Sequence, residues 1–130
     1  MIHSFKVLTT LSAYRCVACV TGTAATVQYP AAATQMPIGV TKDTVKDTTG
    51  AIPVACVGER TRLYFGDTCA SGELVKSLSD GSGARWTIAP DTTTSLTLSG
   101  AYVGVLLGPT IALTGTLAEI LVMPGIAKGI

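Results

Sequence analysis

Short runs of β-branched and other apolar residues alternate with turn-forming residues along the whole chain. Gly, Pro, Asp and Thr separate these runs, and within several of them apolar and polar positions alternate with a period of two. This pattern is typical of β-strands joined by short turns, and no segment keeps a helical period over the roughly 12 residues of an average helix. We therefore expect about ten short strands, within the ranges 5–11, 14–20, 26–29, 36–40, 52–57, 61–65, 72–78, 85–88, 95–98, 101–107 and 117–123.

Two glycine-containing turns predict hairpins. Gly22 lies in a Thr-Gly-Thr turn between the second and third runs, and Asp80–Gly83 is the clearest hairpin turn of the chain, because Gly and Asp accept the backbone conformations of tight turns. Thr41–Gly50 duplicates a Lys-Asp-Thr unit and is expected to be an exposed loop or strand edge, where charge prevents unwanted pairing. Short strands at this spacing predict an all-β sandwich or barrel-like domain with little helix.

The length of the chain allows one domain of ordinary size. A chain of 130 residues can bury a sizeable core but is short for two domains. We expect a single β-domain over residues 13–130, preceded by residues 1–12 as an N-terminal arm or first strand. Arg15 interrupts the apolar stretch that follows Lys6, so a cleaved signal peptide is not expected. No apolar run reaches the ~18–20 residues of a membrane-spanning helix.

The composition is poor in charge. Hydrophobic residues make up 48% of the chain and charged residues 13%, where an ordinary soluble domain has roughly 25% charged residues. This composition excludes disorder, and a net charge of +1 argues against a dedicated nucleic-acid-binding protein. We expect partners to cover much of the surface, and the segment 41–50 and the Asp80 turn to face solvent.

The four cysteines predict neither a metal site nor a disulfide framework. Cys16 and Cys19 have the spacing of a zinc or redox motif, but they lie in a strand-like run, where positions three apart point to opposite faces. Cys56 and Cys69 are too far apart in the sequence to form the second close pair of a zinc ribbon. We expect buried free thiols in a reducing cytosol.

Candidate catalytic residues are few. His3 is the one histidine and lies on a terminal segment, so a triad built around an imidazole is not expected. Most carboxylates occupy turn positions, and Asp43 and Asp47 lack the dense ligand spacing of a calcium loop. Trp86 is the one tryptophan, and a tryptophan within a strand is typical of a core or an oligomer interface. We expect no enzyme activity, cofactor or metal.

Nine stretches that follow one another along the chain have an order that is familiar from a known family. They cover roughly residues 5 to 125: Tyr14–Val17, the turn at Gly22, Ala31–Ala33, Pro37–Val40, Val54–Gly58, Ser71–Val75, Asp80–Gly81, Tyr102–Leu107 and Ala118–Val122. This order resembles the small head-decoration, or capsid-cement, proteins of tailed bacteriophages. In that family a strand ending in Ile-Gly-Val precedes a Val-rich strand, a Gly-Asp-Leu-Val-like step and a final apolar strand. This chain departs from the pattern in having Glu73 where Asp is commoner, and in its four cysteines.

The resemblance implies a non-enzymatic structural protein of the virion. It would be a compact β-domain, commonly a homotrimer at three-fold or quasi-three-fold positions, bound to the outer surface of the capsid after synthesis in the host cytoplasm. Its partner would be the major capsid protein, whose neighbouring subunits it would clamp against the pressure of packaged DNA. It would contact neither nucleic acid nor membrane directly. Extensive contact with partners agrees with the low charge of the chain.

The N-terminal segment, Met1–Leu11, is the strongest candidate for a capsid contact. An extended segment can add a strand to an exposed sheet edge of a partner and bind through main-chain hydrogen bonds. In that case the capsid or subunit interface would include His3, Phe5, Lys6 and Val7, together with Trp86. The alternative is that the segment forms the first strand of the chain's own sheet.

Two other functions compete with the structural one. A β-sandwich binding or adhesion module on a virion or cell surface would need a cluster of exposed aromatic residues around Trp86, with paired acids. A small β-barrel enzyme would need a partner chain to complete its site. A flat interface of standard size or larger, lined by Thr and Val, would favour the structural function instead.

Overall fold

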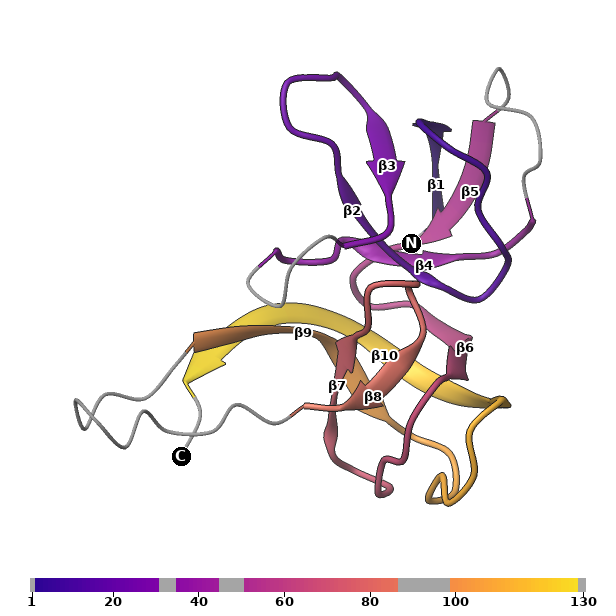
Figure 1. The fold of residues 1–130 in the computed structure, drawn as a ribbon, viewed down its shortest axis with the longest axis vertical. Coiled ribbons are helices and arrows are strands. Elements are labelled where there is room, and N and C mark those ends of the chain that lie inside the picture. The colour runs from indigo at the N-terminus through magenta and orange to yellow at the C-terminus, as the bar shows by residue number, and fades with distance from the viewer. Residues whose placement is uncertain (1, 31–34, 45–50, 87–98, 129–130) are drawn as a thin grey trace.

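The computed structural model describes residues 2–30, 35–44, 51–86 and 99–128, and this part of the chain is all β (Figure 1). It contains ten strands in two sheets and no helix, so it has no helix that could span a membrane. In chain order the strands are β1 (Ile2–Val7), β2 (Cys16–Cys19), β3 (Thr26–Gln28), β4 (Gly39–Thr41), β5 (Ala51–Ala55), β6 (Arg60–Phe65), β7 (Leu74–Ser77), β8 (Gly83–Arg85), β9 (Ser99–Leu106) and β10 (Thr116–Lys128). The predicted all-β, barrel-like fold class is confirmed.

The first five strands close into a barrel in the order β1-β3-β2-β4-β5. β1 pairs in parallel with β3, where Val7 faces Val27, and antiparallel with β5, where Ile2 faces Ala55. Both edges of β1 are therefore paired within the chain, and residues 2–7 form the first strand of the chain's own sheet. Closing a sheet in this way removes the exposed edges on which strands of other chains can pair.

The last five strands close into a second barrel in the order β10-β6-β8-β7-β9. β10 pairs with β6 as far as Leu121 and with β9 from Ile120 onward. The register with β9 shifts between Val122 and Gly125, next to Pro124, which has no N–H to donate to the ladder. Beyond this irregularity, β9 and β10 continue as a two-stranded ribbon that extends away from the barrel (Figure 1).

Each barrel encloses an apolar core, and β2 contributes to both. The first core is built from Val7, Leu11, Val17, Val27, Ile52 and Val54. The second contains mostly side chains of the second barrel, with Phe65 the largest, and also Cys16 of β2 and Val40 of β4. Successive residues of a strand point to opposite faces, so Cys16 packs on the second core while Val17 packs on the first. β2 is therefore buried on both faces.

Backbone hydrogen bonds also join the two barrels. The N–H of Cys16 donates to the carbonyl of Gly81 at 2.7 Å, and the N–H of Tyr64 donates to that of Tyr14 at 2.9 Å. On the connection between β5 and β6, the N–H of Gly58 donates to the carbonyl of Val122 at 2.8 Å. Because buried main-chain groups need partners, the barrels complete one another's hydrogen bonding at this joint.

Both predicted hairpins are confirmed. β2 and β3 pair antiparallel across Gly22, and β7 and β8 pair antiparallel across Gly81. The two glycines have φ angles of +82° and +80°, a region that glycine adopts without strain. The turn chemistry of the sequence was sufficient to locate these connections.

Several boundaries differ from the sequence-based expectation. The first strand ends at Val7 instead of continuing to Leu11, and Trp86 follows β8 instead of lying within it. Thr41, predicted as the start of an exposed segment, belongs to β4 and is buried, because its hydroxyl donates to the carbonyl of Ser12 and accepts from the N–H of Arg15. The predictions for residues 31–33, 45–50 and 95–98 lie outside the described residues.

Candidate functional site

The predicted interface residues are divided between the two barrels. On β1, His3 and Lys6 are exposed, whereas Phe5 and Val7 pack against the first core. Trp86 follows β8 in the second barrel, where it is half-buried and its indole N–H has no hydrogen-bond partner among the described residues. The five residues therefore do not share one strand or one sheet.

The cysteines are free thiols in different environments. Cys16 and Cys69 are buried, Cys56 is half-buried and Cys19 is exposed, so the closely spaced pair Cys16 and Cys19 points to opposite faces, as predicted for a strand. Burial raises the pKa of the Cys16 thiol to about 12 and that of Cys69 to about 11. Both thiols are therefore protonated and unreactive at neutral pH. No group of three potential metal ligands comes together within the described ranges.

The exposed apolar surface is aliphatic. Each of the seven aromatic residues of the chain is described by the structure, and each is buried or half-buried. The large apolar side chains that are exposed are Ile2, Leu8, Met36, Val57, Leu107, Leu113, Leu117 and Met123. A stacking platform for sugars needs several exposed aromatic rings on one face, so the described surface does not have the form of a carbohydrate site.

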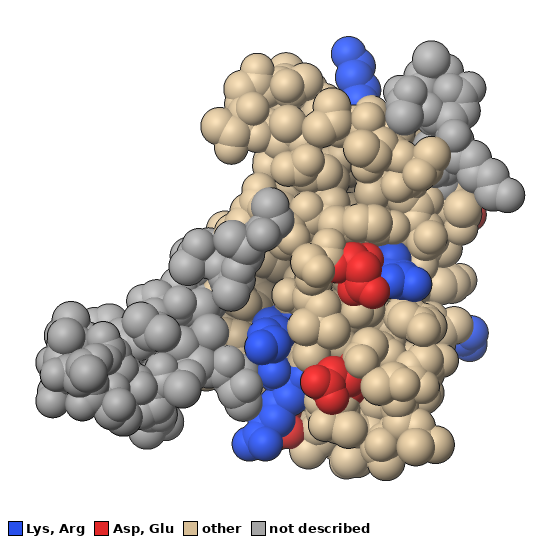
Figure 2. Space-filling model, in the orientation of Figure 1, with Lys and Arg blue, Asp and Glu red and all other residues tan. Residues whose placement is uncertain are grey.

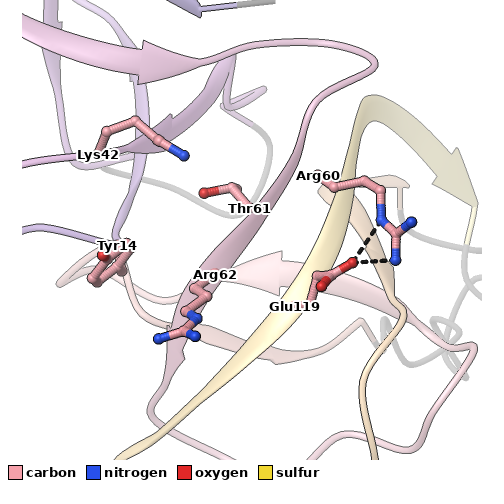
Figure 3. A pocket seen from close by; sticks show the side chains of 6 residues that line it. All are labelled: Tyr14, Lys42, Arg60, Thr61, Arg62 and Glu119. Carbon is pink, nitrogen blue, oxygen red and sulfur yellow. Dashed lines mark hydrogen bonds and ion pairs between the residues drawn. The ribbon is translucent and has the colours of Figure 1, made fainter.

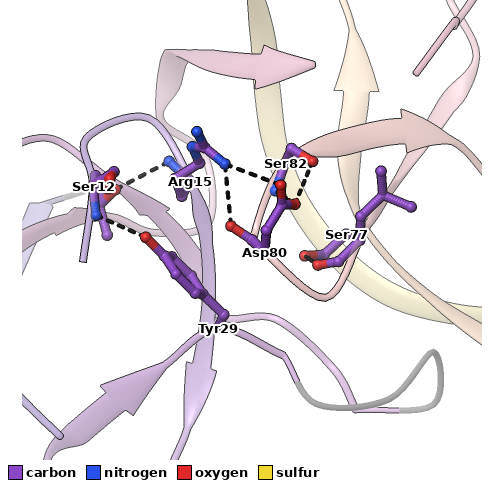
Figure 4. Close-up of polar contacts among 8 residues, drawn as sticks. Ser12, Arg15, Tyr29, Ser77, Asp80 and Ser82 are labelled. Atoms are coloured by element: carbon purple, nitrogen blue, oxygen red, sulfur yellow. Dashed lines mark hydrogen bonds and ion pairs between the residues drawn. The ribbon is translucent and has the colours of Figure 1, made fainter. Parts of the chain in front are cut away.

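Arg15 is the centre of the polar contacts at the joint between the barrels (Figure 4). Its guanidinium Nη1 lies 3.4 Å from Asp80 Oδ2 and donates to the carbonyl of Asp80 at 3.3 Å. The same guanidinium stacks over the ring of Tyr64, with 4.2 Å between its central carbon and the ring centroid. Arg15 precedes β2 in the first barrel, whereas its partners belong to the second, so one side chain connects the two.

The Asp80 carboxylate is also bound by its own turn. Its Oδ1 accepts hydrogen bonds from the hydroxyl and from the backbone N–H of Ser82 (Figure 4). The Ser82 hydroxyl is the main cause that lowers the pKa of Asp80, and the charge of Arg15 lowers it further. The carboxylate therefore stays ionised at the joint down to a lower pH than a free aspartate.

A recess of about 530 Å³ opens beside this joint (Figure 3). Both barrels line it. Tyr14, before β2, and Lys42, after β4, come from the first barrel. The second barrel contributes Arg60, Thr61 and Arg62 of β6 and Glu119 of β10. The recess therefore exists only because the two barrels meet.

Positive charge predominates in the lining of the recess. Arg60 is paired with Glu119, to which its Nε donates at 2.6 Å. Lys42 and Arg62 form no ion pair within the part of the chain that the structure describes. On the face drawn in Figure 2, uncharged residues cover most of the described surface, and charged side chains stand in a few small groups. In a chain with so few charges, two cations without an ion pair beside one recess are a distinct chemical feature.

Thr61 adds a polar group without a partner. It belongs to the inward-facing row of β6 that continues with Leu63 and Phe65, and only 5% of it is exposed. Its hydroxyl has no hydrogen-bond partner within the described residues, and in Figure 3 it points toward the side of the recess on which Lys42 and Tyr14 lie. A buried hydroxyl without a partner costs free energy.

A second, more apolar recess of about 440 Å³ continues from the first along β10. Arg62 and Glu119 line both recesses, and the second is completed by Ala118, Leu117 and the β9–β10 connection, including Pro109 and Ile111. Leu117 is 43% exposed. Because Arg62 and Glu119 border both recesses, we call the two together the groove. Its first recess is cationic and its second is more apolar, which suits an anionic group and an apolar side chain next to it.

None of the residues of this groove was identified from the sequence as a functional residue. The one available signal was the alternation of Arg60 and Arg62 on either side of Thr61, which places two cations on one face of a strand. The proximity of Lys42 and Tyr14 had no signal in the sequence, because they reach the groove from the other barrel.

The fold is similar to that of a solved structure from a bacteriophage. Neither the search of protein-family models nor the search of curated proteins gave a match. The chain is similar to the crystal structure of the N base of head fiber gp8.5 in bacteriophage phi29, with a TM-score of 0.65 and 15% sequence identity. The similarity covers 95% of this chain and 93% of that chain, so it extends over both barrels. At this identity the comparison establishes a common fold.

Proposed function

We propose that the chain is a structural protein of a tailed-bacteriophage head that is mounted on the outer surface of the capsid. The observation that carries this proposal is the fold similarity to a phage head-fiber base over nearly the whole length of both chains. The order of the nine short sequence stretches, which resembles that of the head-decoration proteins, supports the same class of function from an independent source.

The partner in this proposal is the major capsid protein, and the function is to hold neighbouring capsid subunits together without catalysis. A low content of charge and eight exposed large aliphatic side chains in the described residues suit a surface that is covered in an assembly. The proposal includes assembly of the chain as a homotrimer, with its location on the virion and no direct contact with nucleic acid or membrane.

The first experiment tests attachment. The chain is co-expressed with the shell-forming head proteins encoded in the same genome, and the shells are separated by sedimentation. We expect the chain in the shell fraction in a fixed ratio to the major capsid protein, and in the light fraction when the capsid protein is omitted. Absence from the shell fraction would overturn the proposal.

The second experiment tests clamping and oligomeric state. Shells loaded with the chain should rupture at a higher temperature than bare shells, because contacts with neighbouring subunits must break first. Light scattering of the free protein, whose monomer mass is 13.3 kDa, should give the mass of three chains. An unchanged rupture temperature would argue for attachment without clamping, and a monomer both in solution and on the shell would argue against the trimer.

A further inference from the structure

We propose that the groove beside the joint binds an acidic side chain of the protein partner, with an apolar side chain of the same segment in the adjoining recess. This inference rests on the proposed function for the existence of a partner. It adds the chemistry by which that partner is recognised: an aspartate or glutamate carboxylate presented on an extended segment.

The charges of the groove select an anion. Arg60, Arg62 and Lys42 line the first recess together with a single carboxylate, Glu119. Glu119 is paired with Arg60. Arg62 forms no ion pair within the described residues, and Lys42 has only the longer-range attraction of the Glu59 carboxylate, so both cations can contact a ligand. An arginine and a lysine beside one recess can bind a carboxylate through charge-assisted hydrogen bonds, which are among the stronger polar contacts in proteins.

The Thr61 hydroxyl is the second observation. Thr61 is 95% buried, and its hydroxyl, which has no partner within the described residues, is a donor that the folded chain itself does not use. It lies in the wall of the recess and points toward Lys42 and Tyr14 (Figure 3), but the oxygen itself is covered, so a ligand oxygen can contact it only after the neighbouring side chains move apart. Tyr14 lines the same recess.

The adjoining recess favours a protein segment over a small anion. It shares Arg62 and Glu119 with the first recess and exposes the aliphatic side chain of Leu117. In an extended segment, residues i and i+2 point to the same face, so an acidic residue and an apolar residue in these positions can occupy the two recesses together. A net charge of +1 for the whole chain gives no support to a nucleic-acid partner.

The direct test uses short synthetic peptides and calorimetry. One peptide carries an aspartate with a leucine at position i+2, and a second has asparagine in place of the aspartate. We expect the aspartate peptide to bind and the asparagine peptide to bind about tenfold more weakly or worse, because a charged hydrogen bond is lost. The affinity should fall as salt is added, since partly exposed charges are screened.

Variants assign the binding to the groove. The double variant Lys42→Ala with Arg62→Ala should abolish the difference between the two peptides, whereas Lys76→Ala, which removes a cation of β7 that does not line the groove, should leave it unchanged. Thr61→Val keeps the shape of the side chain and removes the hydroxyl. It should weaken the aspartate peptide about threefold without lowering the stability of the free protein. Thr26→Val is the matched control, because the Thr26 hydroxyl is bonded to the Ala24 carbonyl. It should lower stability and leave peptide affinity unchanged.

Sedimentation with shells separates the two proposals. If the wild-type chain sediments with shells and the Lys42→Ala, Arg62→Ala variant is lost from them, both proposals are supported. If both chains sediment equally, the groove does not hold the partner and the further inference fails while the proposed function stands. If neither chain sediments, the proposed function fails, and the peptides alone decide the chemistry of the groove. Equal affinity for both peptides, or binding of inorganic phosphate in place of the aspartate peptide, would overturn the inference.

Discussion

At the scale of single residues, two of the few charged side chains, Arg15 and Asp80, are held in place by contacts with backbone groups, a hydroxyl and an aromatic ring. Arg15 contacts a carboxylate, a carbonyl and the ring of Tyr64 at once, and its side chain is only 20% exposed. Asp80, at 62% exposure, is oriented by Ser82. Each contact is modest by itself, since exposed ion pairs contribute about 1 kcal/mol at most. Together, these contacts hold the two barrels in one relative orientation.

The lowered pKa of Asp80 predicts a pH-dependent contribution to stability. Because the folded pKa lies below the unfolded value of about 4, the unfolded chain binds more protons in this range, and the contribution is present above pH ~4 and is lost as the pH falls through the folded pKa. Asp80→Asn should therefore lower the free energy of unfolding by less than about 1 kcal/mol at pH 7, and by less again near pH 3. Urea unfolding at both pH values measures this, and Asp43→Asn controls for the loss of one surface charge. If the difference in unfolding free energy between wild type and Asp80→Asn is the same at both pH values, the ionised Asp80 carboxylate does not stabilise the fold.

The cysteines predict a graded pattern of reactivity. Cys19 is exposed and should react readily with a maleimide at neutral pH, while Cys56, half-buried and with a pKa raised mainly by burial, should react more slowly. Cys16 should remain unmodified until the protein unfolds, because a pKa of about 12 leaves on the order of a thousandfold less thiolate than an ordinary thiol. Mass spectrometry of peptides after timed labelling gives the order. Early labelling of Cys16 would show that β2 is not buried between the barrels.

At the scale of elements, the tip of the β7–β8 hairpin connects the second barrel to the first. Gly81 combines a φ of +80° with close neighbours: a Cβ there would lie 2.6 Å from Tyr29 Cδ1 and 2.9 Å from the carbonyl oxygen of Cys16. The tip of this hairpin therefore packs directly on the first barrel, and its carbonyl accepts the hydrogen bond of Cys16. Gly22, in the β2–β3 hairpin, has a similar φ of +82°, and a Cβ there would have no atom of the described residues within 4 Å.

This pair of glycines gives a controlled substitution. Gly22→Ala should cost about 1–2 kcal/mol, the usual strain of a left-handed conformation. Gly81→Ala should cost about 1–3 kcal/mol more, because the added methyl also overpacks the joint. Thermal or urea unfolding of the two variants, compared with wild type, isolates the packing contribution. Equal losses of stability would show that the hairpin tip does not pack on the first barrel.

At the scale of the whole molecule, the two small barrels are joined by a strand buried between them, by backbone hydrogen bonds, and by Cys16 and Val40 of the first barrel, which pack in the core of the second. We therefore expect them to fold as one unit. A barrel of five short strands has few positions inside it, and small domains bury a low fraction of their surface. Placing Cys16 and Val40 on the second core increases the buried area of both barrels. The groove proposed to bind the partner lies across the same joint, so binding and stability depend on the same contact between the barrels.

Cooperative unfolding follows from this sharing. Ile52→Ala in the first core and Leu63→Ala in the second should each destabilise the protein by about 2–5 kcal/mol and shift a single transition. Trp86, the one tryptophan, follows β8 in the second barrel, so its fluorescence reports on that barrel while circular dichroism reports on both. Ile52→Ala should move the two signals together. A fluorescence transition that stays in place in Ile52→Ala would show that the barrels unfold independently.

The sequence by itself determined the local structure of this protein. The period of two within the apolar runs identified the strands, and Gly22 and Gly81 located two hairpins, because side-chain alternation and turn conformation are properties of a few consecutive residues. The strand boundaries near Val7 and Thr41 were wrong, since pairing partners and a hydroxyl bonded to distant backbone groups decided them.

Only the tertiary structure decided which strands are neighbours, and hence that ten strands form two closed barrels. Alternation tells which residues share a face, but it does not tell which core that face meets, so the burial of both Cys16 and Val17 was not predictable from the pattern. The groove was not predictable from the sequence pattern either. Its cations come from β6 and from the segment after β4, and they lie side by side only because the closed barrels meet at that point.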